Sequence, residues 1–338
     1  MLLTGVLRKA ALRAGVPSLV RAIGMALGLT AIAHPLRAQA NNGALDLLLP
    51  VGARAAGMGG AFVAEQGAEA VWWNPAGMAR LTKTEFGLDH FETVFIKGDA
   101  LSLIIPVRSV GAFGFSARLF NYGESTRVDT AGVETGTLLN RTVVFGASFS
   151  APVGTNLDAG VTFHLYQGRN DCVGACDSGL FTTSAVDAGV QFRPVVDVPL
   201  RIGLEVRNLG PSLQVHDKPQ ADALPTRVHL GATYDPLFAQ LSQDIRVRAN
   251  AEVVTGLGLG DPEFRAGVQA GYVTTQSTLL VRAGYVAQPG SAGSSSTGPS
   301  LGIGLAQGRV ALDLSRIFES FSTGLGTPPT YISIRVRL

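Results

Sequence analysis

The stretch 52–60, GARAAGMGG, comes closer than any other in this chain to a phosphate-binding loop. A P-loop ends in Gly-Lys followed by Ser or Thr because the lysine contacts the phosphates, but Met58 and Gly59 follow Gly57 here. A dinucleotide-binding fingerprint would need a glycine where Phe62 stands, and a preceding strand. These departures exclude both nucleotide-binding motifs.

Two histidines, His164 and His229, lie on the polar faces of predicted strands with acidic residues nearby. A hydrolase would pair such a histidine with a nucleophile, and the chain has no GxSxG motif. We therefore predict that the protein is not an enzyme, and no motif indicates a cofactor. The net charge of +2 gives no indication of nucleic-acid binding.

The chain has two cysteines, Cys172 and Cys176, in the stretch DCVGACD. An exported protein meets oxidising surroundings, so we expect a local disulfide between them. The alternative is metal binding, but no second cysteine pair or histidine cluster completes a set of four ligands. The sequence therefore predicts no metal site.

The first forty residues are typical of a secretory signal peptide. Four basic residues, Arg8, Lys9, Arg13 and Arg21, precede the apolar run 22–33, and 38–40 reads Ala-Gln-Ala; the first acidic residue is Asp46. Twelve apolar residues are too few to span a bilayer, which takes about twenty. We predict cleavage after Ala40; an organellar presequence is the alternative. Residues 1–40 would then be absent from the mature protein.

After residue 82 the dominant pattern is strict alternation of apolar and polar residues. In 157–166, Leu157, Val161 and Phe163 belong to one face, whereas Asp158 and His164 belong to the other. The same period recurs in 200–207, 226–234, 245–253, 264–272, 279–285, 309–315 and 331–338.

These segments run about nine to eleven residues, the length of a tilted strand that crosses a membrane. Their polar faces carry many charged residues, which need water or partners that a dry sandwich core would not supply. Only 15% of all residues are charged, and 42 are glycine. This balance predicts an all-β fold, a transmembrane antiparallel barrel of about fourteen strands over residues 83–338. The charged residues in question are Arg201, Glu205, Arg207, Arg227, Arg246, Arg248, Glu252, Arg265 and Arg282.

Short and long connections alternate along the predicted strands, as they do in outer-membrane barrels. The short ones, which we expect on the periplasmic side, are 108–111, 151–156, 194–199, 235–243, 274–277 and 306–308. The long ones, rich in Gly, Ser and Pro, are 123–136, 168–179, 208–224, 287–299 and 318–329.

Residues 41–82 differ from the rest, because 60–73 is Ala-rich and reads as short helical turns. Asn74 followed by Pro75 is a good N-cap and first residue for another turn. Glycines would let this backbone pack closely against a neighbour. Since the lumen of a fourteen-stranded barrel is too wide for wall side chains to fill, we expect these residues to form a plug inside it.

The run GARAAGMGGAFVA followed by WWNPAGMARL resembles the N-terminal signature of PorV/PorQ-type proteins, within the FadL-like (OMPP1/TodX) outer-membrane barrels. Weaker similarities lie at 204–212, 224–234, 279–285 and 299–315. The resemblance implies a hatch in the periplasmic end of the barrel. The hatch and gating residues are predicted to be Gly52, Arg54, Gly57, Met58, Gly59, Gly60, Asn74, Pro75, Ala76 and Gly77.

The resemblance implies a bacterial outer-membrane protein and leaves its role open. A FadL-like channel would pass hydrophobic small molecules, with a pocket lined by Phe62, Trp72 and Trp73. A PorV-type component of type IX secretion would instead bind secreted proteins or secretion machinery, and the candidate surfaces are 208–224 and 318–329. A structural barrel with a sealed lumen is the third alternative. In each case the wall would contact outer-membrane lipid, and a hydrophobic ligand, lipid or detergent is the expected small-molecule partner of a channel.

Overall fold

The computed structural model describes residues 43–174, 178–195, 198–215, 221–235, 244–257, 262–288, 297–318 and 328–338. The predicted signal peptide lies outside these residues. Within them, no helix combines the length and the apolar character needed to cross a membrane.

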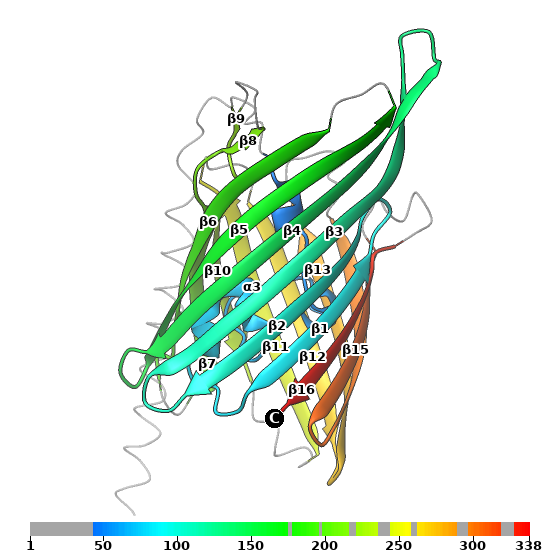
Figure 1. Cartoon of the computed structure of the whole chain (residues 1–338). Coiled ribbons are helices and arrows are strands. Elements are labelled where there is room, and N and C mark those ends of the chain that lie inside the picture. The colour runs from blue at the N-terminus through cyan, green and yellow to red at the C-terminus, as the bar shows by residue number, and fades with distance from the viewer. Residues whose placement is uncertain are drawn as a thin grey trace, which may run out of the picture. The chain divides into compact units, whose positions relative to one another are not determined.

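Fourteen long strands form an antiparallel sheet that closes on itself (Figure 1). Closure occurs where β1 pairs with β2 on one side and β16 on the other. The predicted barrel of about fourteen strands is therefore confirmed. The wall strands are β1 (Glu85–Glu92), β2 (Lys97–Val107), β3 (Gly111–Val128), β4 (Glu134–Pro152), β5 (Leu157–Gly174), β6 (Gly179–Phe192), β7 (Leu200–Leu209), β10 (Arg227–Tyr234), β11 (Ile245–Gly256), β12 (Glu263–Val273), β13 (Ser277–Ala287), β14 (Gly298–Gln307), β15 (Val310–Ile317) and β16 (Thr330–Arg337).

Alternation along each strand separates an outer face from an inner one. On β5, Phe163 and Leu165 are 45% and 54% exposed, whereas Thr162 and His164 are buried. On β16, Ile332 and Ile334 are exposed, whereas Tyr331 and Ser333 are buried. Because successive side chains of a strand point to opposite faces, the wall is apolar outside and polar inside.

The two ends of the barrel differ in their connections, although both hold links of several lengths: 93–96 joins β1 to β2 at one end, and the longer link 235–244 joins β10 to β11 at the other. The link between β2 and β3 is 108–110 and that between β12 and β13 is 274–276, at what we name the short-link end. Most of the longer connections lie at the other, long-link end. There a small hairpin of β8 (Leu213–Val215) and β9 (Ala221–Asp222) pairs with β6.

Two predicted long links are shorter than expected. The stretch 123–136 is mostly strand, because β3 continues to Val128 and β4 begins at Glu134, and β5 likewise runs to Gly174. Pairing of backbone groups needs no apolar side chains, so these hydrophilic residues extend the sheet beyond a bulge in β3 after Asn121. Figure 1 shows the β3–β4 hairpin projecting past neighbouring strand ends.

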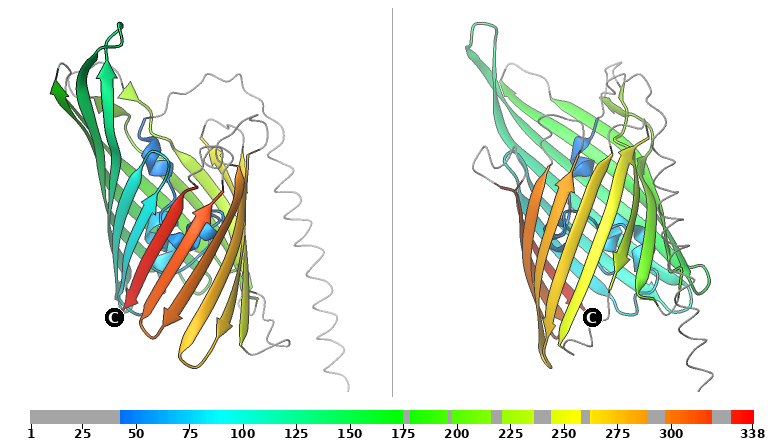
Figure 2. Two further views of the ribbon diagram at one scale, coloured as in Figure 1. Left: turned by 90° about the vertical axis from the view of Figure 1, so that its right-hand side faces the viewer. Right: turned by 180° about the vertical axis from the view of Figure 1, so that it is seen from behind.

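Residues 43–84, which we name the N-terminal segment, run along the inner face of the wall between its two ends (Figure 2). Near the start, Gly43 N–H donates to Ala223 O beside β9 at the long-link end. Near its end, Arg80 donates to Gly154 O and Thr155 O at the short-link end. The segment therefore extends from one end of the ring to the other. The resemblance had implied a hatch in the periplasmic end.

Short helical turns make up part of this segment. The Asn74 side chain accepts from Ala76 N–H and Pro75 is the first residue of η3, which confirms the predicted cap. The sequence predicts helical turns at 60–69 as well, but the structure has no helix there. Gly59 and Gly60 have φ values of 66° and 70°. The helical elements are η2 (Leu45–Leu48), α2 (Ala53–Gly57), α3 (Ala70–Trp73) and η3 (Pro75–Met78).

The sidedness of the barrel can be tested with single cysteines. We expect an Ala131→Cys variant, altered in the β3–β4 link, to react with a membrane-impermeant maleimide in intact bacteria. A Gln276→Cys variant, altered at the short-link end, should react only after the outer membrane is permeabilised, because short links face the periplasm. The unaltered protein is the control. Labelling of Gln276→Cys alone in intact cells would reverse the assigned orientation.

Candidate functional site

Glycines bring the N-terminal segment and the wall into direct backbone contact. A Cβ atom on Gly59 would lie 2.8 Å from Tyr285 N, and one on Gly57 would lie 2.9 Å from Ser315 Oγ. The wall has matching glycines: a Cβ atom on Gly284 would lie 2.1 Å from Gly59 N and 2.3 Å from Met58 C. No side chain fits between these backbones, so their approach depends on glycine on both sides.

The other glycines of the predicted hatch also pack closely against neighbouring atoms. Gly52 has a φ of 92° and packs on the Glu69 side chain, and a Cβ atom on Gly77 would lie 2.3 Å from Glu65 O. At the wall, a Cβ atom on Gly160 would lie 2.6 Å from Ala76 N. The predicted hatch glycines therefore contact the wall or other residues of the segment.

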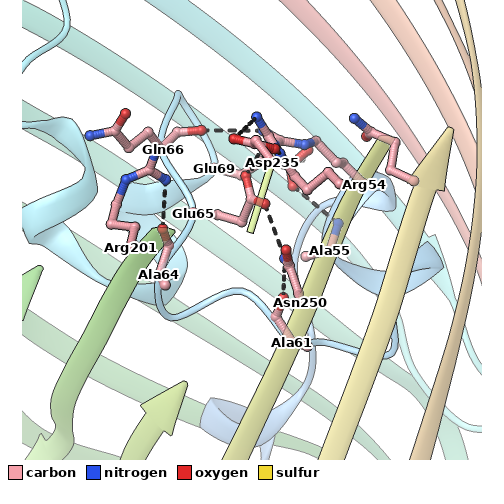
Figure 3. A network of polar contacts seen from close by, with 12 residues as sticks. Arg54, Ala55, Ala61, Ala64, Glu65, Gln66, Glu69, Arg201, Asp235 and Asn250 are labelled. Carbon is pink, nitrogen blue, oxygen red and sulfur yellow. Dashed lines mark hydrogen bonds and ion pairs between the residues drawn. The ribbon is translucent and has the colours of Figure 1, made fainter. Parts of the chain in front are cut away.

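Glu65 is the centre of a buried network of polar contacts between segment and wall (Figure 3). Its carboxylate pairs with Arg54 of the segment and with Arg248 of β11, whose Nη1 lies 2.8 Å away. Asn250 donates to the same carboxylate at 3.0 Å, and Arg248 also pairs with Asp235. Arg54, one of the predicted hatch residues, is thus linked to Arg248 of the wall through their shared partner Glu65.

The titration of these groups follows from their surroundings. Burial alone would raise the pKa of the Glu65 carboxyl, but the guanidinium groups of Arg54 and Arg248 outweigh it and hold the pKa below its ordinary value. Burial lowers the pKa of Arg54 to about 10, against the opposing effect of Glu65. Both groups are therefore charged at neutral pH, and the pair is an ion pair.

A second network joins the segment to the closing strands. Arg335 of β16 lies between Asp313 of β15, with which it pairs, and Glu69, whose Oε1 is 3.8 Å from Arg335 Nε. Arg282 of β13 pairs with the same aspartate at 2.7 Å. Ser333 donates to Asp89 and accepts from Ala53 N–H at 2.7 Å, which fixes the start of α2.

A carboxylate of the wall also accepts hydrogen bonds from backbone N–H groups of the segment. Glu252 Oε2 accepts from the backbone N–H groups of Phe62 and Val63 at 2.7 and 2.9 Å, while its Oε1 lies 2.7 Å from His229 Nδ1. His164 of β5 contacts Asp187 of the neighbouring strand β6 at 2.7 Å. The interior position predicted for both histidines is confirmed, and each has an acidic partner.

The three aromatic residues predicted to line a pocket are packed instead. Phe62, Trp72 and Trp73 are 1–4% exposed, and the rings of Phe62 and Trp73 are 5.9 Å apart. Guanidinium groups lie over the rings, with Arg54 4.9 Å from Phe62 and Arg118 5.7 Å from Trp72. In this arrangement the rings fill space between segment and wall.

A cavity of about 260 Å³ lies at the long-link end, and sequence reasoning did not find it. Its floor adjoins Asp46 of η2, whose Oδ2 accepts from Tyr122 Oη at 2.6 Å and from Tyr166 Oη at 3.1 Å. These residues come from separate strands and the segment, so no local pattern brings them together. The lining residues are Tyr122, Asn140, Arg141, Thr142, Tyr166, Gly168, Arg169, Asn170, Phe181 and Leu213.

Cys172 lies on β5 near this end of the barrel. Cys172 is disulfide-bonded, and Cys176 lies outside the described residues, so the proposed partner remains a prediction. Across the described ranges, no three His, Cys, Asp or Glu side chains are grouped so that they could hold a metal ion.

A closed fourteen-stranded barrel whose lumen holds the N-terminal part of the chain is the fold of FadL/TodX-type outer-membrane channels. The chain is similar to the monoaromatic hydrocarbon channel CymD, with 13% identity and a TM-score of 0.54 over 85% of this chain and 96% of that one. It is similar to the P. putida toluene transporter TodX, with 12% identity and a TM-score of 0.54 over 85% and 98%. A Pseudomonas aeruginosa FadL homologue gives 12% identity and a TM-score of 0.50 over 86% and 98%.

At these identities the similarity concerns the fold, and it confirms the FadL-like part of the predicted resemblance. The model of the Uncharacterised protein family (UPF0164) matches residues 21–336, so the chain belongs to this family. No curated protein matches the chain.

The contacts of Glu65 predict that a single substitution at this position strongly lowers the free energy of unfolding. A Glu65→Gln variant leaves the buried guanidinium group of Arg54 without its ion-pair partner, whereas Arg248 keeps Asp235. We expect a loss of about 3–5 kcal/mol in the free energy of unfolding. The measurement is denaturant unfolding in detergent micelles at pH 7.

The matched control is Asp171→Asn, which removes the partner of Arg169 in a pair whose side chains are 36% and 69% exposed. Its expected cost is at most about 1 kcal/mol. Because the Glu65 pKa is lowered on folding, its contribution is present above the ordinary value of 4.5 and is lost as the pH falls through the folded pKa. Equal losses in the two variants would contradict this role for Glu65.

A second prediction concerns the glycine contact. A Gly284→Ala variant should displace Met58 and Gly59 from the wall, because the new methyl group would overlap their backbone. We expect trypsin to cleave within the N-terminal segment, for example after Arg54, at least several times faster than in the unaltered protein, while the barrel stays folded.

The control is Gly271→Ala, which alters an inward glycine of β12. Its new methyl group would meet a movable side-chain atom, Leu280 Cδ2, at 3.0 Å. Cleavage of this variant should match the unaltered protein. Identical cleavage of the Gly284 and Gly271 variants would show that the segment does not depend on the close contact.

Proposed function

We propose that this protein is an outer-membrane channel for small hydrophobic molecules, in which residues 41–82 act as a movable hatch. The observation that carries the proposal is the course of the N-terminal segment, which contacts the inner wall from the long-link end to the short-link end. Passage through the ring would therefore require the segment to shift.

The way the segment is held suits such a shift. Its helical elements contain only four or five residues each, so they owe their stability to contacts with the wall rather than to their own hydrogen bonds. The wall, in contrast, is closed by its own backbone ladder. Movement of the segment would leave that ladder intact, and segments with few internal contacts are the usual source of local opening.

The outer face supports an outer-membrane location, to which the predicted signal peptide would direct the chain. Leucine, valine, isoleucine and phenylalanine side chains are exposed on nearly every wall strand, and they would be in contact with lipid. A closed ring has no unpaired strand edge, which hydrocarbon would not tolerate.

The proposed solute class rests on the interior aromatic residues and on the relatives of like fold. The solved structures of CymD and TodX are described as a monoaromatic hydrocarbon channel and a toluene transporter. In our proposal Phe62, Trp72 and Trp73 become a hydrophobic surface for solute when the segment shifts. Arg54 and the predicted glycines are the residues whose contacts must break first.

A PorV-type role in type IX secretion is the second candidate. The observation that favours it is the extension of β3–β6 beyond neighbouring strands at the long-link end, which offers an exposed sheet to a protein partner (Figure 1). The described parts of the predicted surfaces 208–224 and 318–329 lie at the same end. Parts of both, 216–220 and 319–327, lie outside the described residues.

The test is uptake by intact cells, where the outer leaflet restricts diffusion of hydrophobic solutes. Expression in a Gram-negative host without its own hydrophobic-compound channel should raise the initial uptake rate of a radiolabelled monoaromatic or fatty acid at least severalfold. Uptake of a small polar solute should not change, because the segment blocks an aqueous path.

Variants separate the alternatives. Gly284→Ala, which loosens the segment, should let polar solutes pass, whereas Gly271→Ala should behave like the unaltered protein. Unchanged hydrophobic uptake on expression would contradict the channel and favour a sealed lumen. Specific co-purification of secretion components with such a sealed protein would favour the secretion role.

A further inference from the structure

The cavity of about 260 Å³ at the long-link end has no role in the hatch mechanism described above. It lies on the inner face of the extended part of the sheet, where β3, β4, β5 and β6 pass beyond η2. None of Phe62, Trp72 and Trp73 lines it. A solute arriving from the long-link side would meet this cavity before it met those rings.

The walls of the cavity are aromatic. Tyr122, Tyr166 and Phe181 come from three different strands, and their side chains belong to the inner face of the barrel by alternation. Gly168 keeps the space between them open: a Cβ atom there would lie 3.3 Å from Phe181 Cδ2 and 3.5 Å from Tyr166 Cε1. The cavity therefore depends on a missing side chain as well as on the rings.

A small number of polar groups accompany the rings. The two tyrosine hydroxyls are already engaged, because both donate to Asp46 Oδ2. Asn140 is different: in the part of the chain that the structure describes, its buried Oδ1 has no hydrogen-bond partner. A buried carbonyl oxygen without a partner loses the hydrogen bonds that water would provide, and a donor nearby would restore one.

The charged residues of the lining lie on the opposite face of their strands. Arg141 and Arg169 are register partners and both are exposed, and Arg169 pairs with Asp171 at 2.6 Å. The inward lining side chains are thus neutral. The charged group nearest to them that the hydrogen bonds identify is the Asp46 carboxylate at the floor, whose Oδ2 accepts from both tyrosine hydroxyls.

We infer that this cavity binds a neutral single-ring aromatic compound that carries one hydroxyl group, with the ring between Tyr166 and Phe181 and the hydroxyl donating to Asn140. This inference rests on the proposed channel function and deepens it by naming the solute class. The volume is slightly below the range of about 300–1,000 Å³ found for sites of drug-sized ligands, which suits one ring.

The composition of the lining favours this class over a sugar. Rings and Leu213 form most of the wall, and Asn140, Thr142 and Asn170 supply the polar contacts. A sugar carries a hydroxyl group on nearly every carbon and would leave several of them unpaired. Aromatic rings instead pack edge-on or offset against Tyr and Phe, with centroids about 4.5–7 Å apart.

The test compares p-cresol with toluene, which differ by the hydroxyl group. The full-length protein in detergent micelles is titrated with each compound by calorimetry, with protein-free micelles as the reference. We expect saturable binding of p-cresol that is about five- to tenfold tighter than that of toluene, since one hydrogen bond accounts for a factor of this size.

Two variants locate the site. Asn140→Leu should bring p-cresol affinity down to that of toluene, and Gly168→Val should weaken both compounds by filling the space beside Phe181 and Tyr166. The matched control is Gln167→Leu, which replaces a polar side chain on the outward face next to Gly168. This control should leave both affinities unchanged.

Three results would overturn the inference: no saturable binding of p-cresol, equal affinity for the two compounds, or an Asn140→Leu variant that still prefers p-cresol. The comparison of two compounds on the unaltered protein stands even if a variant fails to fold. Cellular uptake of hydrophobic solutes without p-cresol binding would contradict this inference and leave the proposed channel function standing. Selective binding of p-cresol without any uptake would contradict the proposed channel function and leave the binding site standing.

Discussion

Closure of the backbone ladder is the constraint from which the rest of this structure follows. In hydrocarbon each unpaired backbone group costs several kcal/mol, so a sheet that spans the membrane must join its first strand to its last. Here β1 pairs with β16 along the whole of both strands, from Glu85 opposite Arg337 to Glu92 opposite Thr330. Fourteen strands joined in this way enclose a lumen wider than their side chains can fill.

The N-terminal segment occupies that lumen, and the polar inner face dictates how it is held. Charged side chains buried there need counter-charges, so Glu65 and Glu69 of the segment pair with or approach arginines of the wall. Glycines on both sides bring backbones together where side chains would interfere. The contacts that hold the segment are also the contacts that a moving hatch would have to exchange, which links stability of the interior to the proposed function.

The pattern of residues predicted the wall well and the interior less well. Alternation located strands and faces, including the inward positions of His164 and His229, because that signal lies within each strand. It failed at 123–136, where hydrophilic strands continue past the apolar band. The helical reading of 60–69 failed for another reason: Glu252, Asn250 and Arg201 bind the backbone of Ala61 to Ala64 in place of helical hydrogen bonds. The rings predicted to line a pocket are covered by arginines, Arg54 of the segment over Phe62 and Arg118 of β3 over Trp72.

The sequence by itself determined the barrel, the inward and outward faces of its strands and the capped turn at Asn74, because these depend on neighbours a few residues apart. Only the tertiary structure decided which charges pair, which glycines meet and where a cavity remains. Those features join residues far apart in the chain, such as Ala53 and Ser333, which are 280 positions apart. Closure of the ring brings such residues together, and no local pattern records which partner each will meet.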